Sequence, residues 1–142
     1  MIESKDLRIG NYVNHSVMGI VRVCKISRTT FKVSHDYDNL FETADEEDCK
    51  PIELTTEILL KCGFEKSLHP KLDKNCWSKN YGSVEIIISN KIFFDVYTKY
   101  NPSNEVREFN YNFITTNNGI NHLHQLQNLF QTLTGKELKV NL

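Results

Sequence analysis

The side chains that could do chemistry in this chain are histidines, cysteines and carboxylates, and most of them are scattered. Of the five histidines, only His122 and His124 lie close together in the sequence. Residues two positions apart in a helix project about 200° apart, so this pair is not expected to share a metal ion. The four cysteines form no CxxC pair and fall in different predicted elements, which indicates free thiols and no zinc or redox centre.

No catalytic motif is present in the sequence. It contains no GxxxxGK[ST] phosphate loop, no GxGxxG turn and no GxSxG nucleophile elbow. The triplet Thr134-Gly135-Lys136 resembles part of a phosphate loop, but it follows a predicted helix. The N–H groups of a helix N-terminus would therefore not face a phosphate there. We expect no enzyme, no cofactor and no resident metal.

The densest group of charges lies between residues 36 and 48. A solvated acidic loop is one interpretation, since charge runs are commonly loops. The other is an acidic surface that meets a basic partner, such as the nucleic-acid channel of another protein. A calcium loop is not expected, because the segment lacks the glycine and the closing glutamate of such a loop. The acidic residues are Asp36, Asp38, Glu42, Asp45, Glu46, Glu47 and Asp48.

A second candidate surface combines lysines with aromatic side chains between residues 66 and 100. Aromatic faces beside lysines can stack single-stranded bases. Alternatively, the aromatics form the core of a sheet and the lysines its solvated edge, and a net charge of −1 does not favour a dedicated nucleic-acid binder. Lys71 and Lys74, in a predicted loop, join the acidic run as candidate partner-binding residues. The lysine and aromatic residues of this second surface are Lys66, Lys71, Lys74, Trp77, Lys79, Lys91, Phe93, Phe94, Tyr97, Lys99 and Tyr100.

Residues 1–52 are predicted to form a small all-β module. Alternating apolar residues at 20–26 and 30–34 indicate short strands, with Phe31 and Val33 facing inward. Several short strands at close spacing favour a small SH3-like barrel or a strongly bent sheet. Because such a short segment buries little surface, we expect it to depend on the rest of the chain for stability.

Residues 53–142 are predicted to form an α-β-β-β-β-α-β module that packs as one unit with the first. Thr55 and Gly63 bound a short helix. Strands are expected near 76–78, 83–88, 91–97 and 105–116, in an antiparallel meander with one polar face. The predicted fold class is therefore α+β.

An apolar stripe near the end of the chain predicts an amphipathic helix that covers this sheet. Asn117, Asn118 and Gly119 are its expected start, and Gly135 suits a left-handed stop. Its glutamines and asparagines are expected to face mostly outward, and residues 137–142 alternate as in a half-buried strand. The stripe consists of Leu123, Leu126, Leu129, Phe130 and Leu133.

Composition is that of a globular domain. The 142 residues are 39% hydrophobic and 25% charged, with a net charge of −1. We find no apolar run near 18 residues and no basic, apolar leader at the N-terminus. The expectation is a cytoplasmic chain without a membrane partner.

Three stretches together resemble a family of small uncharacterised proteins from Bacteroidota and their phages and prophages. They are residues 7–13 (LRIGNYV), residues 54–64 (LTTEILLKCGF), and residues 123–130 (LHQLQNLF) leading to 133–138 (LTGKEL). The resemblance implies a phage or mobile-element protein in the cytoplasm, and it brings no catalytic or site residue with it.

Two hypotheses follow. The first is a non-catalytic protein that binds a host macromolecule, most concretely a counter-defence inhibitor of a CRISPR RNA-guided nuclease. The small size, the lack of an active-site motif and the acidic 36–48 run motivate it. The second is a nucleic-acid-binding accessory module for phage replication or transcription, motivated by the barrel-like N-terminus and the lysine and aromatic residues.

Overall fold

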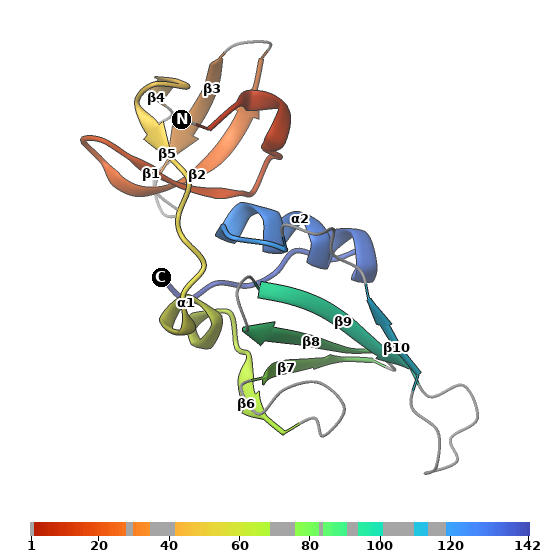
Figure 1. The fold of residues 1–142 in the computed structure, drawn as a ribbon. Helices are drawn as coiled ribbons and strands as arrows, with labels where there is room; N and C mark the ends of the chain where they lie inside the picture. Colours follow the sequence, from red (N-terminus) through yellow and green to blue (C-terminus); the bar gives the residue numbers. More distant parts are fainter. Residues whose placement is uncertain are drawn as a thin grey trace. The chain divides into compact units, whose positions relative to one another are not determined.

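The computed structural model describes residues 2–27, 30–34, 42–68, 76–82, 84–90, 94–100, 110–113 and 119–142. The chain divides into two compact units, which are shown in Figure 1. The first comprises Met1–Leu54 and His122–Leu138 with Leu142, and the second comprises Thr55–Asn121 with Lys139–Asn141. Both units are built on antiparallel sheet and contain an α-helix, so the α+β class is confirmed. None of the described helices is long and apolar enough to cross a membrane.

The first unit is a curled five-stranded antiparallel sheet. Its strand order is β4-β3-β2-β1-β5, so successive strands are neighbours until β5 returns beside β1. This curled sheet corresponds to the small barrel or bent sheet that the sequence predicts. Its elements are the 3-10 helix η1 (Ser4–Asp6) and the strands β1 (Tyr12–His15), β2 (Gly19–Ile26), β3 (Thr30–Ser34), β4 (Glu42–Asp45) and β5 (Cys49–Lys50).

The core of this sheet comes from alternate residues of its central strands. Val21 and Val23 of β2 and Phe31 and Val33 of β3 are all buried. Successive side chains of a strand point to opposite faces, so this alternation places one apolar row inside. The inward direction predicted for Phe31 and Val33 is confirmed. A register shift between Val23 and Lys25 interrupts the ladder, and such a bulge increases local twist and helps a sheet to curl.

Helix α2 (Leu123–Thr134) belongs to the first unit. The Leu123 N–H donates to the Ile52 carbonyl at 2.9 Å, and Glu53 pairs with His122 in an isolated β-bridge. The chain thus leaves the unit after Leu54 and re-enters it at His122. The predicted division at residue 52 placed this helix in the 53–142 module instead. That the helix covers the second sheet stays a prediction.

Helix α2 packs through polar as well as apolar side chains. The Tyr12 N–H donates to Gln127 Oε1 at 3.0 Å, and Gln127 Nε2 donates to the Gly10 carbonyl at 3.1 Å. Asn11 Nδ2 donates to Asn128 Oδ1 at 3.0 Å. Gln127 is only 7% exposed. The expectation that the helix amides face outward is wrong for Gln127, because a fully hydrogen-bonded amide can be buried without a large desolvation cost.

The two ends of α2 differ in how well the sequence predicts them. The start predicted within residues 117–119 is wrong, since the N-cap is His122 and Gln125 Oε1 accepts its backbone N–H at 3.0 Å. Asn117 and Asn118 lie outside the described residues. The stop at Gly135 is confirmed, with φ +71° in the left-handed region.

The second unit is an antiparallel meander with strand order β10-β9-β8-β7-β6. Four of its strands correspond to the predicted ones with shifted ends, and β6 was not predicted. Its elements are α1 (Thr56–Lys61), β6 (Glu65–Ser67), β7 (Cys76–Tyr81), β8 (Val84–Asn90), β9 (Phe94–Tyr100) and β10 (Asn110–Phe113).

Helix α1 begins and ends as predicted. The hydroxyl of the N-cap Thr55 accepts the Ile58 N–H at 3.3 Å. Gly63 follows the helix with φ +75°, and the Phe64 N–H donates to the Leu59 carbonyl at 3.0 Å. This is the glycine stop in which the chain folds back on the last turn.

The central strand β8 is buried on both faces. Ile86, Ile87 and Ile88 are each 1% exposed or less, although consecutive residues of a strand face opposite ways. Ser89 is buried as well. The prediction of a sheet with one solvated face is therefore wrong for this strand.

The strand predicted for residues 137–142 is also wrong. The chain after Gly135 has no assigned strand, and only Leu138 of the alternating residues is fully buried. The Asn141 N–H donates to the Lys61 carbonyl at 3.0 Å. That hydrogen bond ties the tail to the end of α1, not to the edge of a sheet.

Candidate binding surface

Part of the acidic run forms a tight turn between the two edge strands of the first sheet. Asp45 ends β4, and the Asp48 N–H donates back to the Asp45 carbonyl at 3.1 Å. The Ser16 N–H donates to the Asp48 carbonyl at 2.8 Å and fixes the turn against the β1–β2 hairpin. The run between residues 42 and 48 is therefore strand and hydrogen-bonded turn, not an irregular loop. We call Asp45, Glu46, Glu47 and Asp48 the acidic turn.

The side chain of Glu46 ties the acidic turn to η1. Its Oε1 accepts the Ser4 N–H and the Ser4 hydroxyl, each at 2.7 Å. These hydrogen bonds hold the pKa of Glu46 below its usual value, and the one from the Ser4 hydroxyl has the larger effect. A carboxylate at the start of η1 satisfies an otherwise unpaired N–H group. Glu46 therefore anchors the turn and is not free for a partner.

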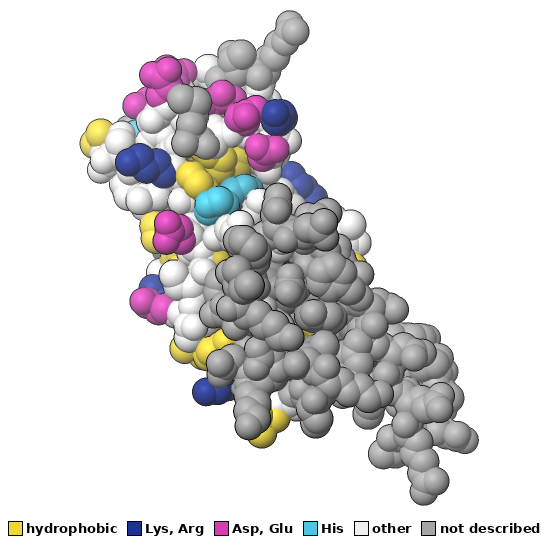
Figure 2. Space-filling model, in the orientation of Figure 1, with side chains coloured by type: hydrophobic (Ala, Val, Ile, Leu, Met, Phe, Trp, Pro, Cys, Tyr) yellow, Lys and Arg dark blue, Asp and Glu magenta, His cyan; other side chains and the backbone are white. Residues whose placement is uncertain are grey.

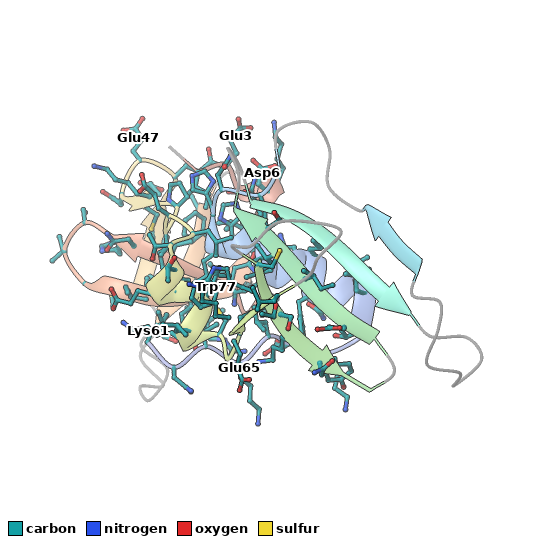
Figure 3. The ribbon with its side chains drawn as sticks, turned by 60° about the horizontal axis from the view of Figure 1, so that its bottom comes forward. Glu3, Asp6, Glu47, Lys61, Glu65 and Trp77 are labelled. Carbon is teal, nitrogen blue, oxygen red and sulfur yellow. The ribbon has the colours of Figure 1, made fainter. Side chains whose placement is uncertain are left out.

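The other three carboxylates of the turn are exposed. Asp45, Glu47 and Asp48 all point into solvent, and Figure 2 shows acidic side chains gathered over this part of the first unit. Figure 3 shows Glu47 and Glu3 projecting away from the ribbon. Lys50, in β5, is a nearby exposed cation. The structure thus brings together the second half of the predicted acidic surface on a fixed backbone.

Of the remaining predicted partner-binding residues, only Glu42 is among the residues that the structure describes. Glu42 lies in β4, where it pairs with Val33 of β3. The others lie outside the described residues, and they are Asp36, Asp38, Lys71 and Lys74.

Two lysines of the second candidate surface, Lys66 and Lys79, have different surroundings. Lys66 of β6 is exposed and pairs across the strands with the half-buried Trp77 of β7, which leaves one lysine beside one indole. Lys79 Nζ instead donates to the Cys62 carbonyl and lies 5.9 Å from the centre of the Phe64 ring. A lysine there stabilises the negative end of α1. Of the rest, Lys91 and Phe93 lie outside the described residues.

The histidine pair is arranged differently from the prediction. His122 is an N-cap with extended backbone, not a helical residue, so the expected 200° separation does not apply. The rings of His122 and His124 stack with centroids 5.6 Å apart. Within the described residues, no three His, Cys, Asp or Glu side chains lie close enough to hold a metal ion.

His124 is buried, and its imidazole is neutral at neutral pH. It is 5% exposed, and its Nδ1 has no hydrogen-bond partner. Burial, and next the neighbouring His122, lower its pKa to about 4, against a smaller opposing effect of Asp6. A neutral imidazole without a hydrogen-bonded acid or nucleophile is not arranged for acid–base catalysis.

The histidine pair lines an open hollow of about 440 Å³ that sequence analysis missed. Its walls come from the N-terminal segment, from Pro51 after β5 and from the first two turns of α2 with its N-cap, so no local pattern could reveal it. Figure 2 shows histidine side chains next to an apolar area of the first unit. The lining residues are Ile2, Asp6, Pro51, His122, His124, Gln125 and Asn128.

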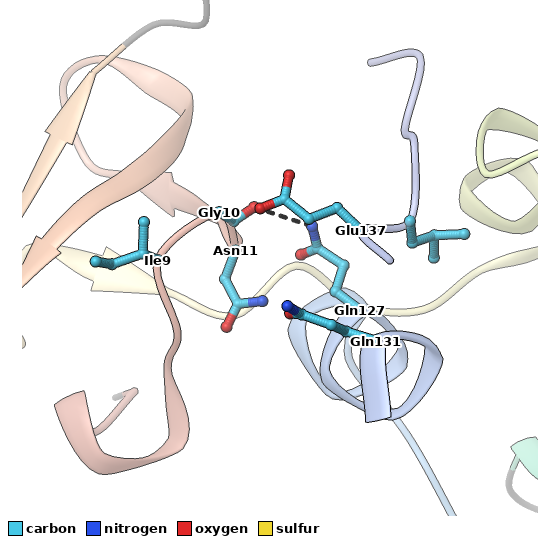
Figure 4. Close-up of a pocket in the computed structure, with 7 residues that line it drawn as sticks. Ile9, Gly10, Asn11, Gln127, Gln131 and Glu137 are labelled. Atoms are coloured by element: carbon cyan, nitrogen blue, oxygen red, sulfur yellow. Dashed lines mark hydrogen bonds between the residues drawn. The ribbon is translucent and has the colours of Figure 1, made fainter. Parts of the chain in front are cut away.

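A smaller pocket lies where α2 meets the segment before β1. Figure 4 shows Gln127 reaching Gly10 there, with Asn11, Gln131 and Glu137 around it. Its volume of about 10 Å³ is near that of one water molecule. Glu137 is paired with Arg22 at 2.6 Å. This pocket is part of the packing of α2 and not a ligand site.

Two of the buried cysteines, Cys49 and Cys62, are poor nucleophiles. Cys49, Cys62 and Cys76 are buried, and Cys24 is half-buried. Burial raises the pKa of Cys49 to about 11 and that of Cys62 to about 12. A thiol that stays protonated at neutral pH is a poor nucleophile.

No protein-family model matches this chain, and neither a curated protein nor a solved structure shows significant similarity to it.

Proposed function

We propose that this chain is a non-catalytic cytoplasmic protein that binds a basic surface of a partner protein through its acidic turn. In its most concrete form the proposal follows the resemblance to phage and prophage proteins. The chain then acts as a counter-defence inhibitor, and the partner is a host RNA-guided nuclease with a positively charged nucleic-acid channel.

The observation that carries the proposal is the fixed display of three exposed carboxylates. Asp45, Glu47 and Asp48 lie within four residues on a backbone held by hydrogen bonds. Like charges held side by side repel one another, and a complementary basic surface relieves this repulsion. Such complementarity raises association rates and excludes wrong partners. Because the backbone is already ordered, binding costs little additional conformational entropy.

The alternative is a nucleic-acid-binding accessory module. It is favoured by the cross-strand neighbours Lys66 and Trp77, since an exposed lysine beside a partly accessible indole can hold a phosphate and stack a base. One lysine and one indole can contact only a short stretch of nucleic acid. The proposal of a protein partner therefore takes precedence.

The test compares the wild-type chain with the triple variant Asp45→Asn, Glu47→Gln, Asp48→Asn. Both are used as bait in a host lysate at low and high salt, and both are assayed for protection of phage against RNA-guided interference. We expect the variant to lose partner capture and protection, because all three changes remove charge and keep shape. A matched control, Glu53→Gln, Glu57→Gln, Glu65→Gln, changes three other exposed carboxylates and should behave as wild type.

Equal activity of the triple variant and the wild type would overturn the proposal. A gel shift of single-stranded DNA or RNA that weakens with salt and is lost in Lys66→Glu would favour the alternative function instead.

A further inference from the structure

The most exposed of the large hydrophobic side chains that the structure describes is Val17. It is 87% exposed and lies at the tip of the β1–β2 hairpin. His15 and Gly19 form the last pair of the ladder, so the loop has three residues, and Gly19 has φ +74°. Left-handed glycine at this position is typical of three-residue hairpin loops. Valine is disfavoured in turns, so local turn preference does not account for it.

The backbone of this tip is fixed by a buried histidine. His15 Nδ1 accepts the N–H groups of Val17 and Met18, each at 3.2 Å. His15 is 9% exposed, so its ring is part of the interior of the first unit. The exposed valine is therefore presented on an ordered loop. An ordered apolar contact loses less entropy on binding than a flexible one.

The tip lies beside the acidic turn. Ser16, the residue before Val17, donates its N–H to the Asp48 carbonyl at 2.8 Å. His15 pairs with Cys49, the residue after Asp48. The apolar tip is thus joined to the acidic turn at Asp48, through a backbone hydrogen bond beside an exposed carboxylate.

We propose that Val17 is the apolar anchor of this surface, and that its partner is a protein with a shallow apolar depression surrounded by basic residues. The inference rests on the proposed function, because the carboxylates beside Val17 define the partner as basic. A single exposed hydrophobic residue is common on protein surfaces. This one differs because its backbone is held in place and its neighbours carry like charges. Interfaces commonly centre on a desolvated apolar contact with charges at the rim.

The experiment uses two labelled probe peptides that differ at one residue. Both are short lysine- and arginine-rich peptides, one with a central phenylalanine and the other with serine there. Each is titrated into the full-length protein at low salt, and Kd is measured by fluorescence anisotropy, with amide shifts of the 15–19 loop as a second readout. We expect the phenylalanine peptide to bind about fivefold more tightly than its serine twin, as expected for burial of one small apolar contact.

The variant Val17→Ser should reduce this ratio to about one while retaining charge-dependent binding. Because Val17 is solvent-exposed, the variant should fold normally, which its thermal unfolding will show. Leu60→Ser is the matched control, since Leu60 is 54% exposed on α1 in the second unit. It should leave the ratio unchanged.

The outcomes separate this inference from the proposed function. If both peptides bind wild type equally and the acidic-turn triple variant weakens both, Val17 is not an anchor but the acidic surface stands. If neither peptide binds at millimolar concentration, the basic-partner proposal fails and this inference fails with it. A phenylalanine preference that persists in Val17→Ser also overturns the inference.

Discussion

His124 makes the stability of the protein depend on pH. Its pKa is lowered to about 4, first by burial and then by His122. In the unfolded chain a histidine titrates near 6.5. Between these values the unfolded state binds a proton that the folded state does not. The stability is therefore complete above about pH 6.5 and falls as the pH decreases towards 4.

We expect acidification across this range to lower the free energy of unfolding by about 2–3 kcal/mol through this residue. Asp6, the carboxylate that opposes the shift, reduces the effect. Urea unfolding of the wild type and of His124→Gln at several pH values measures it. The variant should show a shallower dependence between pH 4 and 6.5, and identical slopes in the two proteins would contradict the assignment.

The thiols provide a second prediction for single residues. Cys24 is half-buried, whereas Cys49 and Cys62 are buried and have raised pKa values of about 11 and 12. Alkylation of the native protein at pH 8, followed by mass spectrometry, should modify Cys24 first. The buried thiols, including Cys76, should react only after unfolding in urea. In the unfolded chain all four cysteines should react at similar rates. Early modification of Cys62 would show that its surroundings open readily in solution.

At the level of elements, the first unit depends on amide hydrogen bonds between α2 and the segment before β1. Gln127→Ala would remove the hydrogen bonds that Gln127 makes to the Tyr12 N–H and the Gly10 carbonyl. We expect a loss of about 2–4 kcal/mol, because each buried unpaired group costs its desolvation energy. Chemical denaturation measures the loss. Gln131→Ala, on the same helix, is the control and should cost about 1 kcal/mol or less. Similar values for both variants would mean that the two hydrogen bonds contribute little.

These hydrogen bonds also join two of the sequence stretches singled out above, residues 7–13 and residues 123–130. Gly10, Asn11 and Tyr12 belong to the first stretch, and their partners Gln127 and Asn128 belong to the last. A structural requirement therefore couples segments more than 110 residues apart, since Tyr12 and Gln127 are separated by 115 positions. Their pairing favours a role in folding over a role in ligand binding.

Features with a local sequence signal have the form predicted for them. The hydroxyl of Thr55, the glycine at position 63 and the alternation around Phe31 and Val33 each act within a few residues, and the structure has the predicted form at all of them. Features that depend on a distant partner were not predicted. Polar Gln127 resembles a surface residue until its hydrogen-bond partners are known.

The same reason accounts for the errors at the candidate site. The acidic run has the composition of a loop, but pairing of Asp45 with Thr30 places its middle in a sheet. Glu46 resembles its neighbours in sequence, yet Ser4 binds it. The hollow beside His124 is assembled from three distant segments and has no sequence signature.

At the scale of the whole molecule, the main segment of the second unit, Thr55–Asn121, is inserted in the sequence of the first. The first unit is discontinuous, because it contains Met1–Leu54 and resumes at His122. The two ends of the insertion lie close together, since the Leu123 N–H donates to the Ile52 carbonyl and Glu53 pairs with His122. Adjacent ends are the geometry in which a domain can be inserted or removed without disturbing its host.

We therefore predict that a shortened chain, with residues 1–54 joined to 122–138 by a short glycine-serine linker, folds as the first unit. It retains the curled sheet and the partners of Gln127, so it should unfold cooperatively and show dispersed amide resonances for β1–β5. Residues 1–54 alone should not, because Gly10 and Tyr12 lose their partners and so small a segment buries too little surface. If instead residues 1–54 fold alone as stably as the linked chain, α2 is dispensable to the first unit. If the linked chain fails to fold while the full chain is stable, the first unit requires the second, and the two are one cooperative structure.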